Sequence, residues 1–253
     1  MNKIIVSKDK LANLENNNIT IHNNEITIKK SGEYTIEYQD CTNVCLKINL
    51  NSNIMIKLFE YSCDQNIEIT NTYNLNEYSN LLLFKFYNNI NVKENLIFNL
   101  NKQYSKIDYH FSNICTNKEN YNITINHNNS NTESMITNKS ITLHNSDLSF
   151  VINSILQKGN KNCILDQQTR IITLEDSNAK IEPNMYIEED DVIAKHGSVI
   201  GNFQEEELFY LMTRGITKQE ATKLLIKGLI FSNLLVDLDK RAKILNIINE
   251  NWR

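Results

Sequence analysis

From about residue 19 to residue 193 the chain alternates apolar and polar residues in short segments, and this pattern limits its fold more than any other feature. Such alternation is typical of half-buried β-strands. The clearest segments are residues 19–21, 25–28, 34–38, 66–69, 96–100, 121–125 and 170–174. No helical periodicity interrupts the series, which argues against alternating βαβ units. The pattern predicts a mainly β fold, as a sandwich, a barrel or a β-helix.

Asparagine takes the place of glycine at the predicted turns. Residues 33–158 contain no glycine, although tight hairpins favour it because it adopts positive φ. Asn also tolerates the left-handed conformation, and it occurs at nearly every predicted turn. Stacked coils of a β-helix use Asn in this way and can hydrogen-bond its amides from coil to coil. The turns therefore favour a solenoid, although no regular repeat period can be assigned.

Composition and charge exclude several classes of protein. The chain has 253 residues and a net charge of −4, with Lys and Arg scattered, so no basic surface for nucleic acid or an anionic membrane is expected. No run approaches the roughly 18 apolar residues that cross a bilayer, and the first residues lack the apolar stretch of a signal peptide. The 5 cysteines are irregularly spaced, which argues against a disulfide framework. A soluble, cytoplasmic protein is expected.

The periodicity becomes helical after Gly201. A first helix is predicted over residues 205–212, followed by Arg214 and Gly215 as a stop. We therefore divide the chain into three expected parts, which are an N-terminal segment at 1–18, a β-helix core at 19–201 and a C-terminal helical region at 202–253.

A second helix is predicted from Thr217 to about residue 235. Thr217 and Glu220 have the spacing of a capping box, in which each side chain satisfies a free N–H group of the other's backbone. The expected apolar face consists of Ala221, Leu224, Leu225, Gly228 and Leu229. A last helix is expected over residues 238–250.

The segment 183–228 differs in composition from the rest of the chain. It holds the only proline and four of the 6 glycines. Such residues impose special backbone conformations, so this segment is the first place to look for function.

The order and spacing of residues here resemble the SufB/SufD family of iron–sulfur cluster assembly scaffold proteins. The matching residues are Pro183, Ile187, Asp190, Asp191, Val192, His196, Gly197, Ser198, Gly201, 207–211, 214–216, Ala221 and Leu224. A weaker match includes His127, Thr132, Ser134, Gln167, Gln168 and 170–174. The His196-Gly197 pair is similar to the SufD branch, because SufB-type chains typically carry His-Glu. Two departures are Ala194, where SufD-like chains often carry Cys, and a shortened N-terminal region.

The resemblance implies a right-handed parallel β-helix core with helices at its C-terminal end. It also implies a dimer through the β-helix ends, with a SufB-like partner or a second copy of the chain. The C-terminal helices would dock a SufC-like ABC ATPase. Because the sequence has no Gly-x-x-x-x-Gly-Lys-Ser/Thr loop, this chain is expected to bind no nucleotide itself.

His196 is the strongest candidate for chemistry. Imidazole is a good iron ligand and can be neutral at cellular pH. The resemblance implies that His196 lies at the dimer interface, in a turn made with Gly197, and takes part in assembling a transient iron–sulfur cluster with a Cys of the partner. The alternative is a turn histidine that only caps the β body.

Acidic and thiol side chains are weaker metal-ligand candidates. The run 188–191 consists of four carboxylates, which could bind a metal, but a solvated turn is the preferred interpretation. Thiolates are the usual cluster ligands, yet a free Cys on a strand is more often a buried apolar residue. Cys163 is the exception retained as a metal-ligand candidate, because it is close in sequence to the terminal coil.

The junction residues Phe209, Tyr210, Arg214 and Gly215 are expected to support the fold or the ATPase contact. Phe209 should seal the end of the β-helix, and Arg214 should bond carbonyls or a carboxylate. Residues 217–253 are the expected ATPase-docking surface, or alternatively a cap on the solenoid.

Together these features predict a non-enzymatic scaffold subunit of a SUF-type iron–sulfur cluster assembly complex. One alternative is a degenerate family member that stabilises the complex without binding the cluster. Another is an unrelated β-helix carbohydrate-active enzyme, against which the missing paired-carboxylate pattern and signal peptide argue.

Overall fold

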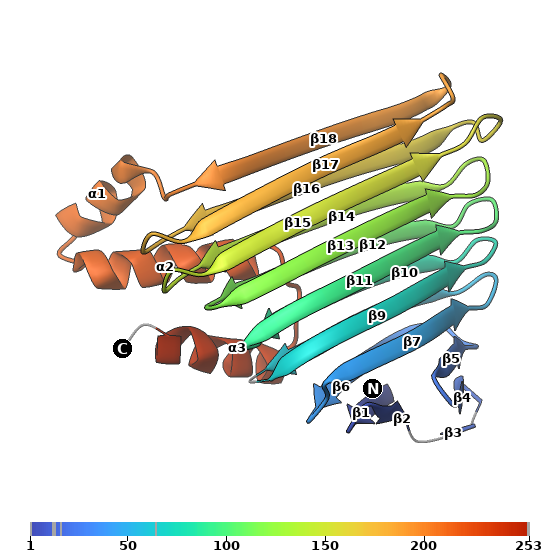
Figure 1. Cartoon of the computed structure of the whole chain (residues 1–253), viewed down its shortest axis with the longest axis horizontal. Coiled ribbons are helices and arrows are strands. Elements are labelled where there is room, and N and C mark those ends of the chain that lie inside the picture. The colour runs from blue at the N-terminus through green and yellow to red at the C-terminus, as the bar shows by residue number, and fades with distance from the viewer. Residues whose placement is uncertain (1, 12–13, 16, 64, 252–253) are drawn as a thin grey trace.

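The chain folds into a flattened β-helix whose coils each give one strand to each of two facing sheets (Figure 1). The computed structural model describes residues 2–11, 14–15, 17–63 and 65–251. Sheet 1 contains β1 (Asn2–Ser7), β2 (Lys10–Leu11), β6 (Gly32–Gln39), β8 (Met55–Cys63), β10 (Asn80–Asn88), β12 (Lys106–Cys115), β14 (Glu133–Thr142), β16 (Cys163–Thr173) and β18 (Val192–Gly201). Sheet 2 contains β3 (Leu14–Glu15), β4 (Ile19–His22), β5 (Glu25–Ile28), β7 (Asn43–Leu50), β9 (Asn66–Leu75), β11 (Asn91–Leu100), β13 (Lys118–His127), β15 (Asp147–Leu156) and β17 (Asn178–Ile187).

The alternation of apolar and polar residues in the sequence matches the alternation of buried and more exposed side chains along the strands. In β9, for example, Ile67, Ile69, Asn71, Tyr73 and Leu75 are buried, and the residues that alternate with them are partly exposed. Successive side chains of a strand point to opposite faces, so one set fills the space between the sheets. The predicted parallel β-helix is confirmed.

Uneven coil lengths explain why no repeat period is visible in the sequence. Hydrogen-bonded Asn residues on neighbouring coils are 25 residues apart at Asn74 and Asn99, 27 apart at Asn99 and Asn126, and 31 apart at Asn122 and Asn153. The extra residues of the later coils lie in turns, so strand pairing stays in register. The expected Asn amide ladder is present.

The turns that precede β8, β10, β12, β14 and β16 each hold a residue with a left-handed backbone. These residues are Asn53, Tyr78, Tyr104, Asn131 and Asn162, with φ between 53° and 60°. Asn adopts this conformation more readily than other side chains. Three of the five positions therefore confirm that Asn replaces Gly at the turns, whereas two use stacked tyrosines.

The two ends of the β-helix differ. At the N-terminal end, short antiparallel strands cover the first coil, because β4 pairs with β3 and β5, and β2 with β1. β1 itself pairs in parallel with β6, so part of the segment at 1–18 extends sheet 1. At the other end the coil stops at β17 and β18, which are each 10 residues long.

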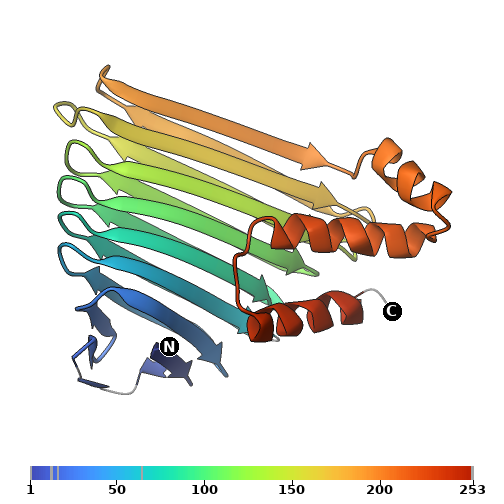
Figure 2. The same ribbon diagram turned by 180° about the vertical axis from the view of Figure 1, so that it is seen from behind.

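Helices α1 (Glu205–Thr213), α2 (Lys218–Phe231) and α3 (Leu238–Asn251) follow the last strand. Figure 2 shows α2 and α3 side by side against the outer face of sheet 1. They pack on an apolar patch that includes Phe84, Phe86, Ile114 and Ile141. The β-helix therefore has a second hydrophobic core outside the coils.

The predicted capping box at α2 is confirmed, since the Thr217 hydroxyl accepts the Glu220 N–H and the Glu220 carboxylate accepts the Thr217 N–H. Two details were wrong. α2 ends at Phe231, so the second helix is shorter than predicted. Leu224 is 47% exposed, because the buried face of α2 consists of Ala221, Ile226, Leu229 and Ile230.

The interior contains charged side chains that the alternation alone does not explain. Lys85 lies between Glu60 and Glu94, and all three side chains are fully buried. Tyr38 and Tyr87 donate hydrogen bonds to these carboxylates. The residues come from β6, β8, β10 and β11, so the cluster ties neighbouring coils together.

Candidate functional site at the open end of the β-helix

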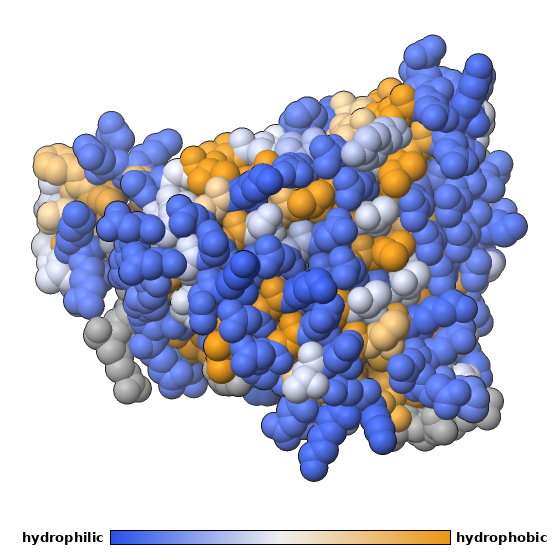
Figure 3. All heavy atoms as spheres, viewed as in Figure 1, coloured by the Kyte–Doolittle hydropathy of each residue, from blue (hydrophilic) through white to orange (hydrophobic). Residues whose placement is uncertain are grey.

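The terminal coil is an open edge of both sheets. β18 pairs with β16 on one side, and β17 with β15, and neither has a neighbour on its other side among the described residues. Large apolar side chains on these strands are exposed, namely Tyr186, Ile193, Val199 and Ile200. In Figure 3 hydrophobic patches alternate with hydrophilic ones along the margin that β17 and β18 form. A flat, partly apolar strand edge of this length can form backbone hydrogen bonds with a strand of another chain.

His196 and Gly197 lie in the middle of β18 rather than in a turn, so the predicted His-Gly turn was wrong. The backbone turns earlier, between β17 and β18, over residues 188–191. His196 is exposed and pairs in register with the buried Gln167. In-register residues of parallel strands point to the same face of a sheet. His196 therefore faces the interior of the solenoid, where the missing next coil leaves it open to solvent.

The coil below His196 presents polar groups on the same face. Gln167 Nε2 donates hydrogen bonds to Ser154 Oγ at 2.7 Å and to Asn184 O at 3.2 Å. Gln167 Oε1 is buried and forms no hydrogen bond with any described residue. His196 therefore faces the buried amide of Gln167, whose Oε1 accepts no hydrogen bond from the described residues.

Gly197 makes room for the side chain of Gln168 on the outer face of sheet 1. A Cβ atom at position 197 would lie 2.5 Å from Gln168 Oε1. The Gln168 amide also donates a hydrogen bond to Asp166 at 2.9 Å. The glycine therefore lies within a strand, beside the flexible end of the Gln168 side chain, and not in a turn.

The four carboxylates at 188–191 form the turn between the last two strands, as the preferred interpretation held. The Glu189 carboxylate accepts the Gly159 N–H at 2.9 Å, and the carbonyl of Asp191 accepts the Asn162 N–H at 2.7 Å. The Gly159 hydrogen bond keeps the pKa of Glu189 below its usual value. These contacts of Glu189 and Asp191 join neighbouring turns.

Cys163 does not meet His196 within the chain. It pairs with Val192, four residues before His196 on the same strand, which corresponds to about 13 Å along a strand. The sulfur is buried and lies 3.3 Å from Thr132 Oγ1 and 3.4 Å from Asn129 O. Its neighbours are a hydroxyl and carbonyl oxygens, an environment that suits a thiol.

The weaker upstream motif forms a buried polar network. His127 Nδ1 lies 2.7 Å from Thr132 Oγ1, and Nε2 lies 2.8 Å from Ser134 Oγ. Burial lowers the pKa of His127 to about 3, so the ring is neutral. Through Thr132 the network reaches Cys163, a contact that the sequence did not indicate. It leaves no ring nitrogen of His127 free for a metal.

Helix α1 contains no buried residue, so the prediction that Phe209 seals the β-helix was wrong. Phe209 is 69% exposed, and Tyr210 and Met212 are also at the surface. Arg214 lies over the Tyr210 ring, 5.3 Å from its centroid, instead of reaching a carboxylate. Gly215 has φ 83° and ends the helix as predicted. α1 thus presents an apolar surface to solvent.

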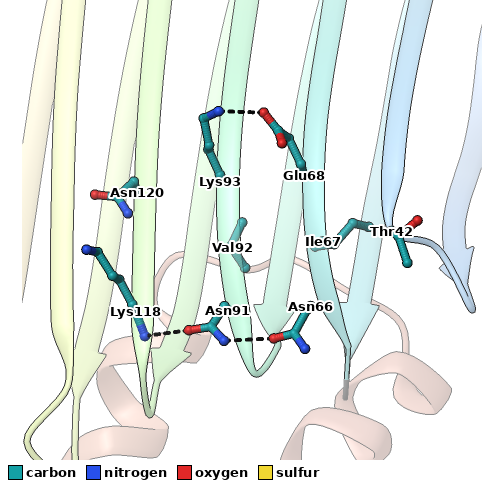
Figure 4. Close-up of a pocket in the computed structure, with 9 residues that line it drawn as sticks. All are labelled: Thr42, Asn66, Ile67, Glu68, Asn91, Val92, Lys93, Lys118 and Asn120. Atoms are coloured by element: carbon teal, nitrogen blue, oxygen red, sulfur yellow. Dashed lines mark hydrogen bonds and ion pairs between the residues drawn. The ribbon is translucent and has the colours of Figure 1, made fainter.

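A groove of about 430 Å³ lies across the first residues of β9, β11 and β13 (Figure 4). Its polar side chains are engaged with one another. Lys93 forms an ion pair with Glu68 at 2.6 Å, and the Asn91 amide donates to Asn66 at 2.7 Å. These are ladder contacts between coils and carry no sign of a binding site.

The described part of the chain brings together no three His, Cys, Asp or Glu side chains that could hold a metal ion. Within the same residues, no helix is long and apolar enough to cross a membrane. These features define a parallel β-helix protein with an open terminal coil, an inward-facing histidine at that coil and an attached helical region.

Comparison with known proteins identifies the family. Residues 68–229 match the family described as SUF system FeS cluster assembly, SufBD core domain. The match covers more than half of the chain and includes both the terminal coil and most of α2. The chain therefore belongs to the SufBD family of the SUF iron–sulfur cluster assembly system.

Individual relatives match shorter segments. The iron–sulfur cluster assembly protein SufD of Bacillus subtilis is 36% identical over 76 residues, which are 30% of this chain and 17% of that protein. A SufBD family protein of Mycobacterium leprae is 47% identical over 47 residues, 18% of this chain and 12% of its own length. One from Staphylococcus haemolyticus is 31% identical over 104 residues, 40% of this chain and 22% of its own. The alignments thus span less than a quarter of each relative.

Proposed function

We propose that this chain is a non-enzymatic scaffold subunit of a SUF-type iron–sulfur cluster assembly complex in the cytoplasm. It acts with a SufC-like ABC ATPase and with a SufB-like subunit or a second copy of itself. The family match supports the system, and the open terminal coil with His196 on its inner face carries the proposal for this chain. The His196-Gly197 pair supports a SufD-like subunit over a SufB-like one.

The contrast between the two ends of the β-helix supports a dimer through β17 and β18. Proteins protect exposed sheet edges with short or irregular strands, and the N-terminal end has such strands. The C-terminal edge has none and exposes Val199 and Ile200. A second β-helix docked end to end would pair this edge and cover these side chains.

In that dimer His196 would supply one ligand to the cluster, which is cargo rather than a resident cofactor. The chain alone has no set of side chains that could complete a metal site among its described residues. The remaining ligands, including a thiolate, would come from the partner. Cys163 stays a less favoured ligand, because its sulfur is buried about 13 Å along the strand from His196.

Replacing His196 with alanine should lower the iron and sulfide content of the purified complex severalfold without preventing its assembly. The complex is obtained by co-expressing this chain with the ATPase and the second SufBD subunit under anaerobic conditions, and iron and sulfide are measured per complex. Lys195→Ala is the matched control, because Lys195 is the preceding, exposed residue of the same strand and points to the opposite face.

Each result of this experiment decides a different question. If no ATPase co-purifies with the wild-type chain, the assembly proposal is rejected. If the complex forms and His196→Ala keeps its full cluster content, the chain is the degenerate structural member that stabilises the complex without binding cluster. The family match gives no support to the carbohydrate-active alternative.

Replacing Phe209 with serine should weaken ATPase binding at least about tenfold, as removal of an exposed aromatic anchor does at protein interfaces. Phe209 is 69% exposed in the isolated chain, so the stability of the chain should change little. Isothermal titration calorimetry with the purified ATPase measures the effect. Glu206→Ser on the same helix is the control, and equal affinities of the two variants would remove α1 from the docking surface.

A further inference from the structure

The loop between α2 and α3 is anchored in sheet 1 by one buried side chain, Asn233, which is 3% exposed. Its Nδ2 donates hydrogen bonds to Phe111 O at 2.8 Å and to Ser112 Oγ at 3.1 Å, and lies 3.4 Å from Thr137 O. β12 and β14 thus both hold the loop. Asn233 is the buried polar contact at this point, and beside it the partly exposed Lys139 Nζ donates a hydrogen bond to Ser232 Oγ at 2.8 Å.

These contacts determine the orientation of the Asn233 amide. Phe111 O and Thr137 O are carbonyl acceptors, so the group that faces them must be the NH2 group. The carbonyl oxygen, Oδ1, then faces Nδ1 of His110 at 3.0 Å. Because Oδ1 is only an acceptor, Nδ1 of His110 must carry a hydrogen.

The other ring nitrogen of His110 also faces an acceptor. Nε2 lies 2.9 Å from Asp108 Oδ1, and an ionised carboxylate only accepts hydrogen bonds. A neutral imidazole has one N–H and cannot donate in both directions. We infer that His110 is held as an imidazolium that bridges Asp108 and Asn233, and that it forms a proton-dependent latch between the β-helix and the helical region.

The charges around His110 are few. Asp108 is on the same strand, and Lys139 on β14 opposes protonation. The neighbour on β10 is Phe84, which stacks on the ring at 5.1 Å, and the α2–α3 loop contributes the neutral Asn233. Burial lowers the pKa of His110, but the hydrogen bonds to Asp108 and Asn233 outweigh burial and hold the pKa above its usual value.

The sign of the pH dependence follows from this direction. A group whose pKa is raised by folding stabilises the fold fully below its unfolded pKa, and the stabilisation is lost as the pH rises through the folded pKa. When His110 loses a proton, one of its ring nitrogens has no hydrogen to donate to the oxygen that it faces, which is Asn233 Oδ1 or Asp108 Oδ1. The contact between the α2–α3 loop and sheet 1 should therefore weaken from neutral to alkaline pH. This inference does not depend on the proposed function.

The protonation state is tested directly by NMR of the wild-type chain with ¹⁵N-labelled histidine, and His110→Gln assigns the signal. At pH 6 both ring nitrogens of His110 should carry hydrogen, and the ring should titrate above the usual pKa of a histidine. A ring that carries a single hydrogen at pH 6 overturns the inference. This measurement uses the unaltered protein, so it does not depend on how a variant folds.

The latch itself is tested by hydrogen exchange of residues 218–251 between pH 6 and pH 9, corrected for the intrinsic pH dependence of exchange. Protection in wild type should fall severalfold over this range, because the contact made by the charged ring is lost as His110 deprotonates. His110→Gln should show low protection that does not vary with pH, while exchange of β8–β11 stays unchanged. His144→Gln is the control, since His144 pairs with Glu175 at a turn. Equal protection of wild type at both pH values would refute the latch.

Discussion

Replacing Lys85 with methionine is expected to lower the free energy of unfolding at pH 7 by about 3–5 kcal/mol. Lys85 Nζ lies 3.3 Å from Glu60 Oε2 and also forms an ion pair with Glu94, and none of the three side chains is exposed. Methionine fills most of the space of lysine but removes the only cation of the cluster. Two buried carboxylates then remain without a counter-charge. Urea unfolding followed by circular dichroism measures the loss.

An exposed ion pair provides the matched control. Lys93 pairs with Glu68 at 2.6 Å on the outer face of sheet 2, and Lys93→Met should change stability by less than about 1 kcal/mol. Burial raises the pKa of Glu60, against the effect of Lys85, so the Lys85→Met deficit should shrink at pH 5 as carboxylates take up protons. A Lys85→Met chain as stable as wild type at pH 7 would show that the charge of Lys85 is not needed to stabilise the two buried carboxylates.

The alternation of the sequence was sufficient to predict the strands because burial in a solenoid follows the same period of two. It could not distinguish a solenoid from a barrel, since that choice depends on which strands pair. Parallel pairing here joins residues 22 to 32 positions apart, and no local pattern records such distances. Asparagine supplied the clue, because amide ladders such as Asn74 to Asn99 require stacked coils.

The position of His196 was predicted incorrectly for an identifiable reason. A glycine at 197 after an acidic run is a common turn signal, but this glycine lies inside β18, beside the side chain of Gln168. The alternation continues through Ala194, His196 and Ser198, and following it would have placed His196 on the inner face of a strand. The sequence alternation therefore indicated that the His196 side chain points inward, but the glycine at 197 was given more weight and led to the wrong prediction of a turn.

Two features had no local signal. Phe209 belongs to a helix with apolar residues that usually indicate burial, yet α1 contacts the helical region without burying any residue. Lys85, Glu60 and Glu94 occupy inward positions where charged residues are rare. Each is explained only by partners from other coils, so sequence periodicity could not predict them.

Replacing Glu119 with glutamine is expected to stabilise the chain, relative to wild type, increasingly as the pH rises. Glu119 is fully buried and accepts hydrogen bonds from Tyr121 at 2.6 Å and Asn113 at 2.5 Å. Burial raises its pKa from 4.5 to about 8, and the two hydrogen bonds offset this only in part. The unfolded chain thus releases the proton near pH 4.5, whereas the folded chain keeps it until about pH 8.

This difference fixes the sign and size of the effect. A carboxyl whose pKa is raised by folding stabilises the folded chain fully below pH 4.5, and that stability is lost as the pH rises through 8. At 1.36 kcal/mol per pKa unit, the advantage of Glu119→Gln over wild type should be about 4 kcal/mol larger at pH 9 than at pH 5. Urea unfolding of both chains at both pH values measures it. An advantage that does not change with pH would mean that Glu119 is ionised in the folded chain, and that the polar groups around it stabilise the carboxylate in spite of its burial.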